Sequence, residues 1–488
     1  MKVLLINPPF QRFFGGGKSP KLPLGLCYIA SYLTYNGYET FVYDAEFNPI
    51  GSSSVLIKEV TENIENYFKA LDDMNNEIWK EIKNKIKSYS PDVVGVSVKT
   101  ATFKAGLNIA KLCKEIDKNI VVIMGGPHIC CNPEDIGRYD FVDYGVIGEG
   151  EITTLELLKN IENRKTPSNI KGVVYKNNGK TVITPRRELI KELDSIPIPE
   201  HEHIIDLDKI PREYHGEIIT GRGCPYSCTF CASSLVWEKK VRFRKPEKVV
   251  EEIEYILNKF GTNYFYIEDD TFTIKKDFAI KICDLLIEKN LPIKWSCETR
   301  ANLVDEELIK KLKEAGCDDI SIGVESGSDE TLEKIKKGIN KDQIKKAFEI
   351  IKKFGIKTSA FVMIGFPWEN KDDMLNTINF AKSLKPDRII FSIVTPYPGT
   401  ELYEYCLQAF PGKIPKNTTW EEFFHQSGKI VLPEMSKEDF YETIEKLEKE
   451  ILIYMFKKRI LDYSFISLKL KEFLKNPKKF FSQIKHIF

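Results

Sequence analysis

The chain has 488 residues, too many for one compact hydrophobic core, and its length predicts about three domains. Its 42% hydrophobic and 29% charged residues exclude an intrinsically disordered protein. Lys and Arg number 72 against 71 Asp and Glu, so no overall electrostatic field attracts nucleic acid, and we expect no nucleic-acid partner. The sequence has no apolar stretch of about 20 residues and no secretory signal at its start, which predicts a cytoplasmic location.

The first 185 residues alternate short apolar runs, typical of strands, with amphipathic stretches typical of helices. Such alternation predicts βαβ units, and therefore an α/β domain over residues 1–185 with a Rossmann-like, doubly wound parallel sheet. The charged and periodic residues 55–86 predict one long helical segment. The strand-like runs fall at residues 2–6, 41–43, 92–97, 120–124 and 141–147.

Residues 186–215 interrupt this alternation, and their three prolines and scarce apolar runs predict an extended linker. A second β/α series follows over residues 216–410. Its six units predict a partial (β/α)6 barrel, with functional groups at the C-terminal ends of its strands. The strand-like runs of this series fall at residues 216–220, 264–267, 292–296, 319–324, 357–364 and 388–394.

Residues 411–488 predict a C-terminal α-helical region, in which residues 437–488 look helical throughout. From residue 451 onward the chain has 9 Lys and Arg against 2 Asp and Glu, mixed with aromatic and aliphatic residues. A basic amphipathic helix of this kind can lie on an anionic membrane surface, which would make the protein peripheral to a membrane. The alternative, which we favour, is a helical cap that packs on the barrel with its lysines in solvent.

Three cysteines lie close together just after the first strand of the second series. Cys224, Cys228 and Cys231 are separated by three and then two residues, so a compact loop can direct their sulfur atoms at one point. Iron–sulfur clusters select thiolate ligands, and three thiolates leave one iron of a four-iron cube open. A structural zinc site needs a fourth nearby ligand, and none follows within the loop. The odd number of cysteines, 11, favours metal ligation or free thiols over a disulfide framework.

This cysteine spacing, with motifs at the ends of the later strands, resembles the radical S-adenosylmethionine (SAM) family. The resemblance implies a 4Fe–4S cluster held by the three cysteines, SAM chelated to the fourth iron, and an external electron donor of the flavodoxin or ferredoxin kind. In that family an electron from the cluster cleaves SAM to methionine and a 5′-deoxyadenosyl radical. The resemblance assigns a cofactor-binding role to the strand-end residues Asp269, Asp270, Arg300, Glu325 and Gly365.

Each of these strand-end residues also has a structural interpretation. Asp269 and Asp270 can cap the helix that follows them. Glu325 can pair with Arg300. Gly365 lies in a Gly-Phe-Pro sequence, and its role can be to form a turn without contacting a cofactor.

The first domain resembles the cobalamin-binding Rossmann-type domain that precedes the barrel in one branch of radical SAM enzymes. Small residues after its strand-like runs allow a large ligand to approach the backbone closely. The resemblance implies that a pocket for the nucleotide tail of cobalamin is lined by Ser97, Gly125 and Gly126, with Pro23, Gly25 and Asp44 as further candidates.

One position departs from a known cobalamin pattern. Domains that ligate cobalt through a histidine carry Asp-x-His-x-x-Gly, but Asp44 is followed two residues later by Glu46. Any cobalamin here is therefore not expected to take a histidine from that loop. His128, in the Gly-Gly-Pro-His turn, is a candidate substitute, and we interpret it as an ordinary polar loop residue.

These features together indicate a cobalamin-dependent radical SAM enzyme similar to the class B methyltransferases. Its expected reaction methylates an unactivated carbon of a small-molecule or lipid-like substrate, because such a carbon has no acidic proton for a general base and requires a radical route. A cyclase or rearrangement enzyme with the same cofactors remains the alternative. A non-catalytic cobalamin or redox sensor is a third interpretation, which the full set of strand-end motifs disfavours.

Overall fold

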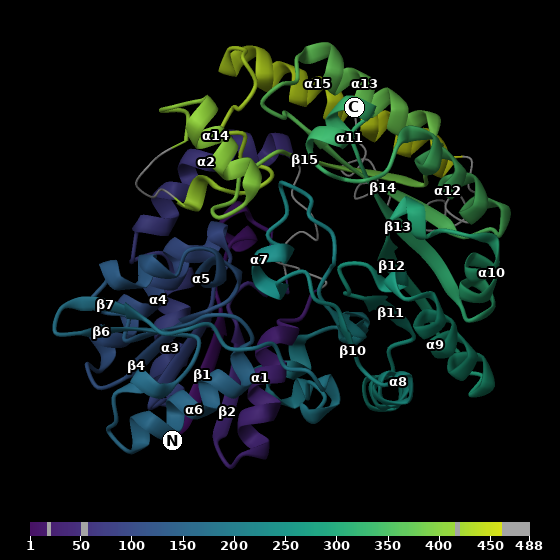
Figure 1. The fold of residues 1–488 in the computed structure, drawn as a ribbon. Coiled ribbons are helices and arrows are strands. Elements are labelled where there is room, and N and C mark those ends of the chain that lie inside the picture. The colour runs from purple at the N-terminus through teal and green to yellow at the C-terminus, as the bar shows by residue number, and fades with distance from the viewer. Residues whose placement is uncertain (17–20, 50–56, 415–419, 461–488) are drawn as a thin grey trace, which may run out of the picture.

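The computed structural model describes residues 1–16, 21–49, 57–414 and 420–460. Two β-sheets organise the chain into two lobes that lie side by side (Figure 1). The first lobe is built on a seven-stranded sheet in the order β2-β1-β3-β4-β5-β6-β7, whose first five strands are parallel. Its strands are β1 (Lys2–Asn7), β2 (Glu39–Asp44), β3 (Val93–Ser97), β4 (Val121–Gly125), β5 (Tyr144–Val146), β6 (Val173–Asn177) and β7 (Lys180–Ile183).

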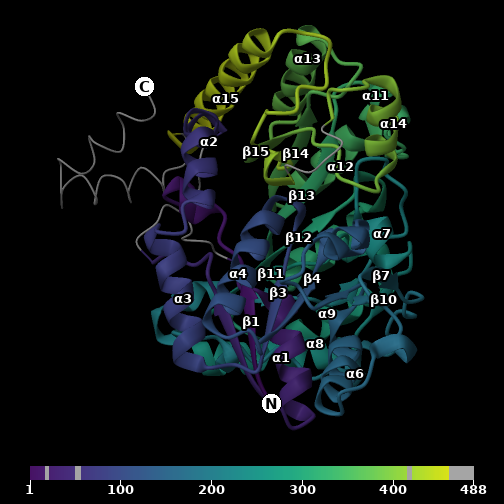
Figure 2. The same cartoon turned by 90° about the vertical axis from the view of Figure 1, so that its left-hand side faces the viewer.

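Helices cover both faces of this sheet, which confirms the doubly wound α/β fold. One hydrophobic core forms between the sheet and α3 and α4, and a second core forms between the opposite face and α1 and α6. Figure 2 shows α3 on one side of the sheet and α1 and α6 on the other. The helices of this lobe are α1 (Leu24–Tyr35), α2 (Ile57–Asp72), α3 (Glu77–Tyr89), α4 (Phe103–Ile116), α5 (Pro127–Cys131) and α6 (Gly150–Glu162).

The helical segment predicted over residues 55–86 consists of two helices, α2 and α3. The chain breaks between them because the Asn76 side chain accepts a hydrogen bond from the Ile78 N–H and so caps the start of α3. The Asp73 side chain accepts from the Asn75 N–H one turn earlier. Short polar side chains that bind the local backbone in this way favour a helix boundary over a helix interior. Residues 55 and 56 lie outside the described residues.

Residues 186–215 are not a free extended linker. They form four short 3-10 turns joined by extended residues, and they pack against the first sheet, where Ile204 bridges Val42 of β2. Ile190, Ile196 and Ile210 are buried in the process. The isolated isoleucines of this segment are therefore anchors that fix the path between the two lobes.

The second lobe contains six parallel strands in the order β15-β14-β13-β12-β11-β8, which confirms the partial barrel. The strands are β8 (Glu217–Ile218), β11 (Tyr264–Ile267), β12 (Lys294–Thr299), β13 (Cys317–Glu325), β14 (Lys357–Ile364) and β15 (Arg388–Ile393). Helices lie on the convex outer side of these strands (Figure 1). They are α8 (Pro246–Phe260), α9 (Lys276–Glu288), α10 (Glu306–Glu314), α11 (Asp329–Lys334), α12 (Lys341–Lys353) and α13 (Lys371–Ser383).

A small antiparallel ribbon follows β8 and positions the cysteine loop. Its strands, β9 (Gly221–Arg222) and β10 (Arg242–Phe243), enclose the cysteine loop and the short helix α7 (Ser233–Trp237). In Figure 1, α7 lies between the two lobes. The cysteines are therefore at the C-terminal edge of the barrel strands, on the side that faces the first lobe.

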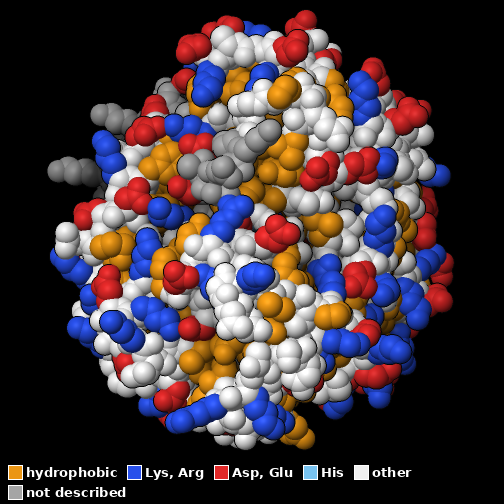
Figure 3. All heavy atoms as spheres, turned by 60° about the vertical axis from the view of Figure 1, so that its left-hand side comes forward, with side chains coloured by type: hydrophobic (Ala, Val, Ile, Leu, Met, Phe, Trp, Pro, Cys, Tyr) orange, Lys and Arg blue, Asp and Glu red, His pale blue; other side chains and the backbone are white. Residues whose placement is uncertain are grey.

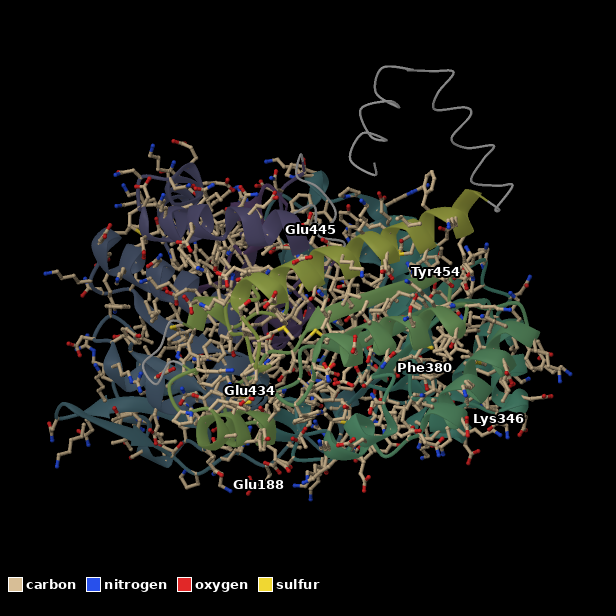
Figure 4. All side chains as sticks on the ribbon, turned by 90° about the horizontal axis from the view of Figure 1, so that it is seen from above. Glu188, Lys346, Phe380, Glu434, Glu445 and Tyr454 are labelled. Atoms are coloured by element: carbon tan, nitrogen blue, oxygen red, sulfur yellow. The ribbon has the colours of Figure 1, made fainter. Side chains whose placement is uncertain are left out.

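The C-terminal part of the chain joins the lobes. After α14 (Glu401–Ala409), residues 420–432 return to the first lobe, where the Trp420 ring lies 5.4 Å from the His128 ring. The long helix α15 (Lys437–Ile460) then packs on α13, and the Tyr454 hydroxyl donates to the Pro386 carbonyl oxygen at 2.7 Å. Figure 4 shows α15, which carries Tyr454, running along the molecule beside the helix that carries Phe380.

The predicted basic helical tail is described only in part. Residues 451–460 belong to α15, and residues 461–488 lie outside the described residues. Of the helices that the structure describes, none combines the length and apolar character that crossing a membrane requires. On the face shown in Figure 3, basic and acidic side chains are interspersed, consistent with the net charge of +1.

Candidate active site

The cysteine loop starts at a glycine that no other residue can replace easily. Gly223 has φ +100°, and a Cβ atom there would overlap the Lys240 carbonyl oxygen. The turn that follows is closed by a hydrogen bond from the Cys231 N–H to the Cys228 carbonyl oxygen at 3.1 Å. All three loop cysteines are partly exposed, whereas most of the other cysteines of the chain are buried. The loop therefore brings three partly buried cysteines together at the barrel edge.

The three thiols do not form a compact site for a single metal ion in the described part of the chain. Among the described residues, no three His, Cys, Asp or Glu side chains converge closely enough to hold one metal ion. A four-iron cube needs a wider arrangement, because each cysteine binds a different iron atom. Burial raises the pKa of Cys224, and it raises the pKa of Cys231 to about 11, so cluster binding must displace thiol protons.

Arg300, at the end of β12, lies against the cysteine loop. Its Nη1 donates to the Cys228 sulfur at 3.7 Å, and its guanidinium carbon lies 3.6 Å from the centre of the Tyr226 ring. Its Nη2 donates to the Lys337 carbonyl oxygen. The predicted pairing of Arg300 with Glu325 is not present; Arg300 binds the cysteine loop instead.

The two aspartates after β11 have different roles. Asp269 is buried, and its carboxylate accepts from the Thr220 N–H at 2.7 Å and the Gly221 N–H at 3.1 Å. Burial raises the pKa of Asp269 to about 6. Asp269 therefore holds the turn between β8 and β9. Asp270 is exposed and accepts from the Ser233 hydroxyl at 2.6 Å, beside the cysteine loop. The alternative prediction, that these aspartates cap the following helix, is wrong, because no side chain caps the start of α9.

Glu325 ends β13 in a strained conformation. It has φ +61°, which only a few per cent of non-glycine residues adopt, and the register of β13 with β14 shifts at this point. The carboxylate is buried and pairs with the Lys337 ammonium at 2.6 Å. Sequence reasoning missed Lys337, because a lysine twelve residues along the chain carries no local signal.

Gly365 follows β14 with φ +87°. Its N–H and that of Phe366 both donate to one oxygen of Glu369, at 2.8 and 3.0 Å. Burial raises the pKa of Glu369 to about 7. A Cβ at position 365 would lie 3.2 Å from the Phe440 ring of α15, so this turn also contacts the C-terminal helix.

A cavity extends from the first sheet to the cysteine loop. It contains about 1290 Å³ of empty space, part of it open to solvent. At one end it runs between the sheet and the helices α1 and α6, over Leu5, Ile123 and Val146. At the other end it reaches Gly223 and Asp270. The two lobes therefore line one continuous space.

The walls of the sheet end of this cavity are made of small residues. Gly25, Ser97, Gly125 and Gly126 all line it, and Ser97 pairs with Gly125 across β3 and β4. A Cβ at Gly25 would meet no atom within 4 Å, so α1 leaves open space there. Gly126 has φ +100°, and a Cβ there would lie 2.8 Å from the Val98 carbonyl oxygen. The small side chains therefore leave the backbone open along this part of the cavity.

Three other residues singled out in the first lobe do not line this cavity. Pro23 precedes α1, and its carbonyl oxygen accepts from the Leu26 N–H. Asp44 is buried and accepts from the Asn7 side chain at 2.7 Å, and burial raises its pKa to about 6. His128 is fully buried between Phe103 and Trp420, with its Nε2 3.1 Å from the Asp135 carboxylate. It is a core residue rather than a loop residue.

Glu46, which stands where a cobalt-ligating histidine would be, caps a backbone turn. Its two carboxylate oxygens accept from the Phe10 N–H at 2.5 Å and the Gln11 N–H at 2.8 Å. Burial raises the pKa of Glu46 to about 7. Both oxygens are occupied by the protein's own backbone.

An ion-pair network that the sequence did not reveal joins the lobes at the cavity wall. Arg222 donates to Glu149 and to Glu151, at 2.7 Å each, and Arg242 donates to the other oxygen of Glu149 at 2.7 Å. All four side chains are at most 10% exposed. The only local signal is the Gly-Glu-Gly-Glu sequence at 148–151, whose partners lie more than 70 residues away.

Two family models match this chain in the same two regions. The radical SAM superfamily model matches residues 218–381, and the B12 binding domain model matches residues 18–158. An uncharacterized methyltransferase, PH0819, from Pyrococcus horikoshii is 35% identical over 413 residues, which are 83% of this chain and 83% of that protein. The chain belongs to the radical SAM enzymes that carry a B12-binding domain. Membership of this family gives it three cofactors: a 4Fe–4S cluster, SAM and cobalamin.

Two further similarities cover most of the chain. The anaerobic magnesium-protoporphyrin IX monomethyl ester cyclase of Rubrivivax gelatinosus is 27% identical over 482 residues, which are 95% of this chain and 79% of that protein. The structure of the radical SAM methyltransferase TsrM from Kitasatospora setae, solved with cobalamin and a 4Fe–4S cluster, has the same fold. Its TM-score is 0.65 at 19% identity, covering 87% of this chain and 81% of TsrM.

Proposed function

We propose that this radical SAM enzyme transfers a methyl group from SAM, through cobalamin, to an unactivated carbon of a small-molecule or lipid-like substrate. The observation that carries the proposal is the cavity that is lined by the small-residue slot of the first lobe at one end and by Gly223, where the cysteine loop begins, and Asp270 at the other. When bound, cobalamin supplies a methyl carrier, and the reduced cluster supplies the electron that cleaves SAM. The chain's own task is to hold both on the walls of one space and to limit the access of water to it.

Particular residues are proposed for each group. Cys224, Cys228 and Cys231 would hold the cluster, because they are the partly exposed thiols of one loop. Asp270 lines the cavity beside that loop, and it is the aspartate that we propose to contact the amino group of SAM. Asp269 would act on SAM only by fixing the β8–β9 turn.

The slot between the first sheet and α1 would hold the nucleotide tail of cobalamin. It is lined by glycine, serine and aliphatic side chains, and the shape left by Gly25 and Gly125 accommodates a ligand without displacing the helix. Pro23 is proposed only as a residue that sets the start of α1. Glu46 is not proposed as a cobalt ligand, since the backbone of residues 10 and 11 occupies its oxygens.

The methyl-transfer step can be tested without knowing the substrate. Protein reconstituted anaerobically with iron, sulfide and cobalamin is reduced and supplied with SAM carrying a ¹³C-labelled methyl group. We expect the label on the extracted corrinoid and 5′-deoxyadenosine in solution, both measured by mass spectrometry. If 5′-deoxyadenosine forms while the corrinoid stays unlabelled, the enzyme is not a methyltransferase.

A cyclase or rearrangement reaction is the second candidate function. It is favoured by the cyclase of Rubrivivax gelatinosus, which aligns with nearly the whole chain. In that case SAM cleavage would persist and no methyl group would leave SAM. The labelling experiment above separates the two candidates.

Three proposals concern the enzyme's surroundings. The cluster would be reduced by an external flavodoxin- or ferredoxin-like donor, and the enzyme would work in the cytoplasm. Contact of the basic C-terminal segment with anionic lipid surfaces is the alternative to the helical cap that we favour; its residues 461–488 lie outside the described residues. Co-sedimentation with anionic liposomes, with and without residues 451–488, tests the lipid contact, and equal binding by both proteins would contradict it.

A further inference from the structure

Arg300 differs from the other buried arginines of the chain in having no acidic partner. Its residue is only 4% exposed, yet no carboxylate lies within 4.0 Å of its guanidinium anywhere in the described residues. By contrast, Arg222 and Arg244 are buried and paired with glutamates at 2.6–2.7 Å. A buried charge without a counter-ion is costly, so its retention at this position requires an explanation.

The contacts of Arg300 orient its charge toward the cysteine loop. The Tyr226 ring supports the flat face of the guanidinium at 3.6 Å, and the Lys337 carbonyl oxygen accepts from Nη2. Nη1 is left to donate to the Cys228 sulfur at 3.7 Å. Tyr226 itself is held by the Asn302 side chain, which donates to its hydroxyl at 3.5 Å. Nε has no hydrogen-bond partner among the described residues.

The direction of the resulting effect follows from charge. A four-iron cluster held by three thiolates is anionic, and it gains a further negative charge when it is reduced. A buried cation beside one of the thiolates stabilises the reduced state more than the oxidised state, since Coulomb attraction is strong where water is excluded. A hydrogen bond to a ligand sulfur acts in the same direction, and both effects raise the reduction potential of iron–sulfur clusters.

We propose that Arg300 tunes the reduction potential of the cluster by donating to the Cys228 sulfur, and that Tyr226 holds it in place. Arg300 is then a positioning and electrostatic residue of the cysteine loop, not a residue that contacts SAM. Its role is to make the cluster easier to reduce by the external donor. The proposal rests on the cluster, which the family membership gives, and not on methyl transfer.

The test is a reductive titration of the reconstituted protein without SAM. The electron paramagnetic resonance signal of the reduced cluster monitors the titration. Arg300→Gln retains a hydrogen-bond donor but removes the charge. We expect its reduction equilibrium to fall about tenfold, a potential lower by about 59 mV for one electron. Arg300→Lys keeps the charge and should shift the potential less. Arg388→Gln is the matched control, because Arg388 pairs with Asp319 at the opposite end of the barrel strands.

An unchanged potential in Arg300→Gln, at wild-type iron content, would overturn the proposal. If Arg300→Gln does not retain iron, Tyr226→Leu provides the second test. That variant keeps the charge but removes the ring that holds it, so its potential must also fall. A potential equal to that of the wild type in Tyr226→Leu would equally contradict the role assigned to Arg300. Because SAM and cobalamin are absent from the titration, failure here leaves the methyl-transfer proposal untouched.

Discussion

Removing the charge of Glu149 should loosen the junction between the two lobes. Glu149 accepts hydrogen bonds at 2.7 Å from Arg222, Arg242 and the Ile190 N–H, and it is buried. In Glu149→Gln the side-chain NH₂ would face one of the two arginines, donor against donor. The buried network would then carry one uncompensated positive charge.

The magnitude follows from the burial of the network. Removing one partner of a buried ion pair costs about 3–5 kcal/mol, and we expect the lower end because Glu151 still pairs with Arg222. A loss of about 3 kcal/mol increases local opening by roughly 100-fold. The matched control is Glu156→Gln. Glu156 lies on α6, the helix that begins just after Glu149, but its pair with Arg187 is partly exposed and should be worth about 0–1 kcal/mol.

Hydrogen–deuterium exchange is the appropriate assay, because a chain with two lobes need not unfold in one step. Peptides that contain the Ile190 amide and the β9–β10 ribbon should exchange about two orders of magnitude faster in Glu149→Gln than in the wild type. The same peptides should be unchanged in Glu156→Gln. Equal exchange in the two variants would refute the inference that this network fixes the cysteine loop to the first lobe.

Three further outcomes follow from the structure. Gly25→Phe should fill the slot and weaken cobalamin binding by at least about tenfold, as measured by corrinoid absorbance after desalting. Gly25→Ala should bind cobalamin normally, because a methyl group meets no atom there; equal binding by both variants would place cobalamin elsewhere. Cys224→Ala should lose the cluster and 5′-deoxyadenosine formation, while Cys131→Ala, a cysteine of the facing lobe, should keep both; the reverse pattern would contradict the ligand assignment. Burial raises the pKa of Glu369 from an ordinary 4.5 to about 7, so the folded state binds this proton more tightly than the unfolded state does. The protonated group therefore stabilises the fold below pH 4.5. This contribution, at most about 3 kcal/mol, is lost as the pH rises to 7. Glu369→Gln has no proton to lose, so the thermal unfolding midpoint of this variant should rise relative to that of the wild type between pH 4.5 and 7. A difference in midpoint that does not change with pH would show that the carboxyl of Glu369 is not the group responsible.

The sequence predicted the elements whose signal is local. Each strand of the partial barrel is an apolar run that ends in a polar or glycine-rich motif, and all six runs are strands of the second sheet. The β6–β7 hairpin was missed, although its turn contains the Asn178-Gly179 pair that favours tight hairpins. The break between α2 and α3 was also missed, since helical periodicity on both sides outweighed the polar residues between them.

The contacts that define the site were mostly beyond sequence reasoning. The spacing of the three cysteines is a local pattern, so the sequence alone was enough to predict a shared metal-binding loop. Arg300 was only the structural alternative for the partner of Glu325, and the partner in the structure is Lys337, toward which the carboxylate points from a backbone with φ +61°. The contact between Arg300 and Cys228 joins positions 72 residues apart, and only the curvature of the barrel brings them together.

The central claim, that one chain holds a three-cysteine cluster and a corrinoid on facing walls of the same cavity, is tested most directly by cofactor content. Protein reconstituted anaerobically with iron, sulfide and hydroxocobalamin, then desalted, should contain close to four irons and one corrinoid per chain. Its absorbance spectrum should show both chromophores. Protein that retains zinc in place of iron, or that emerges from the desalting column without corrinoid, would contradict the account.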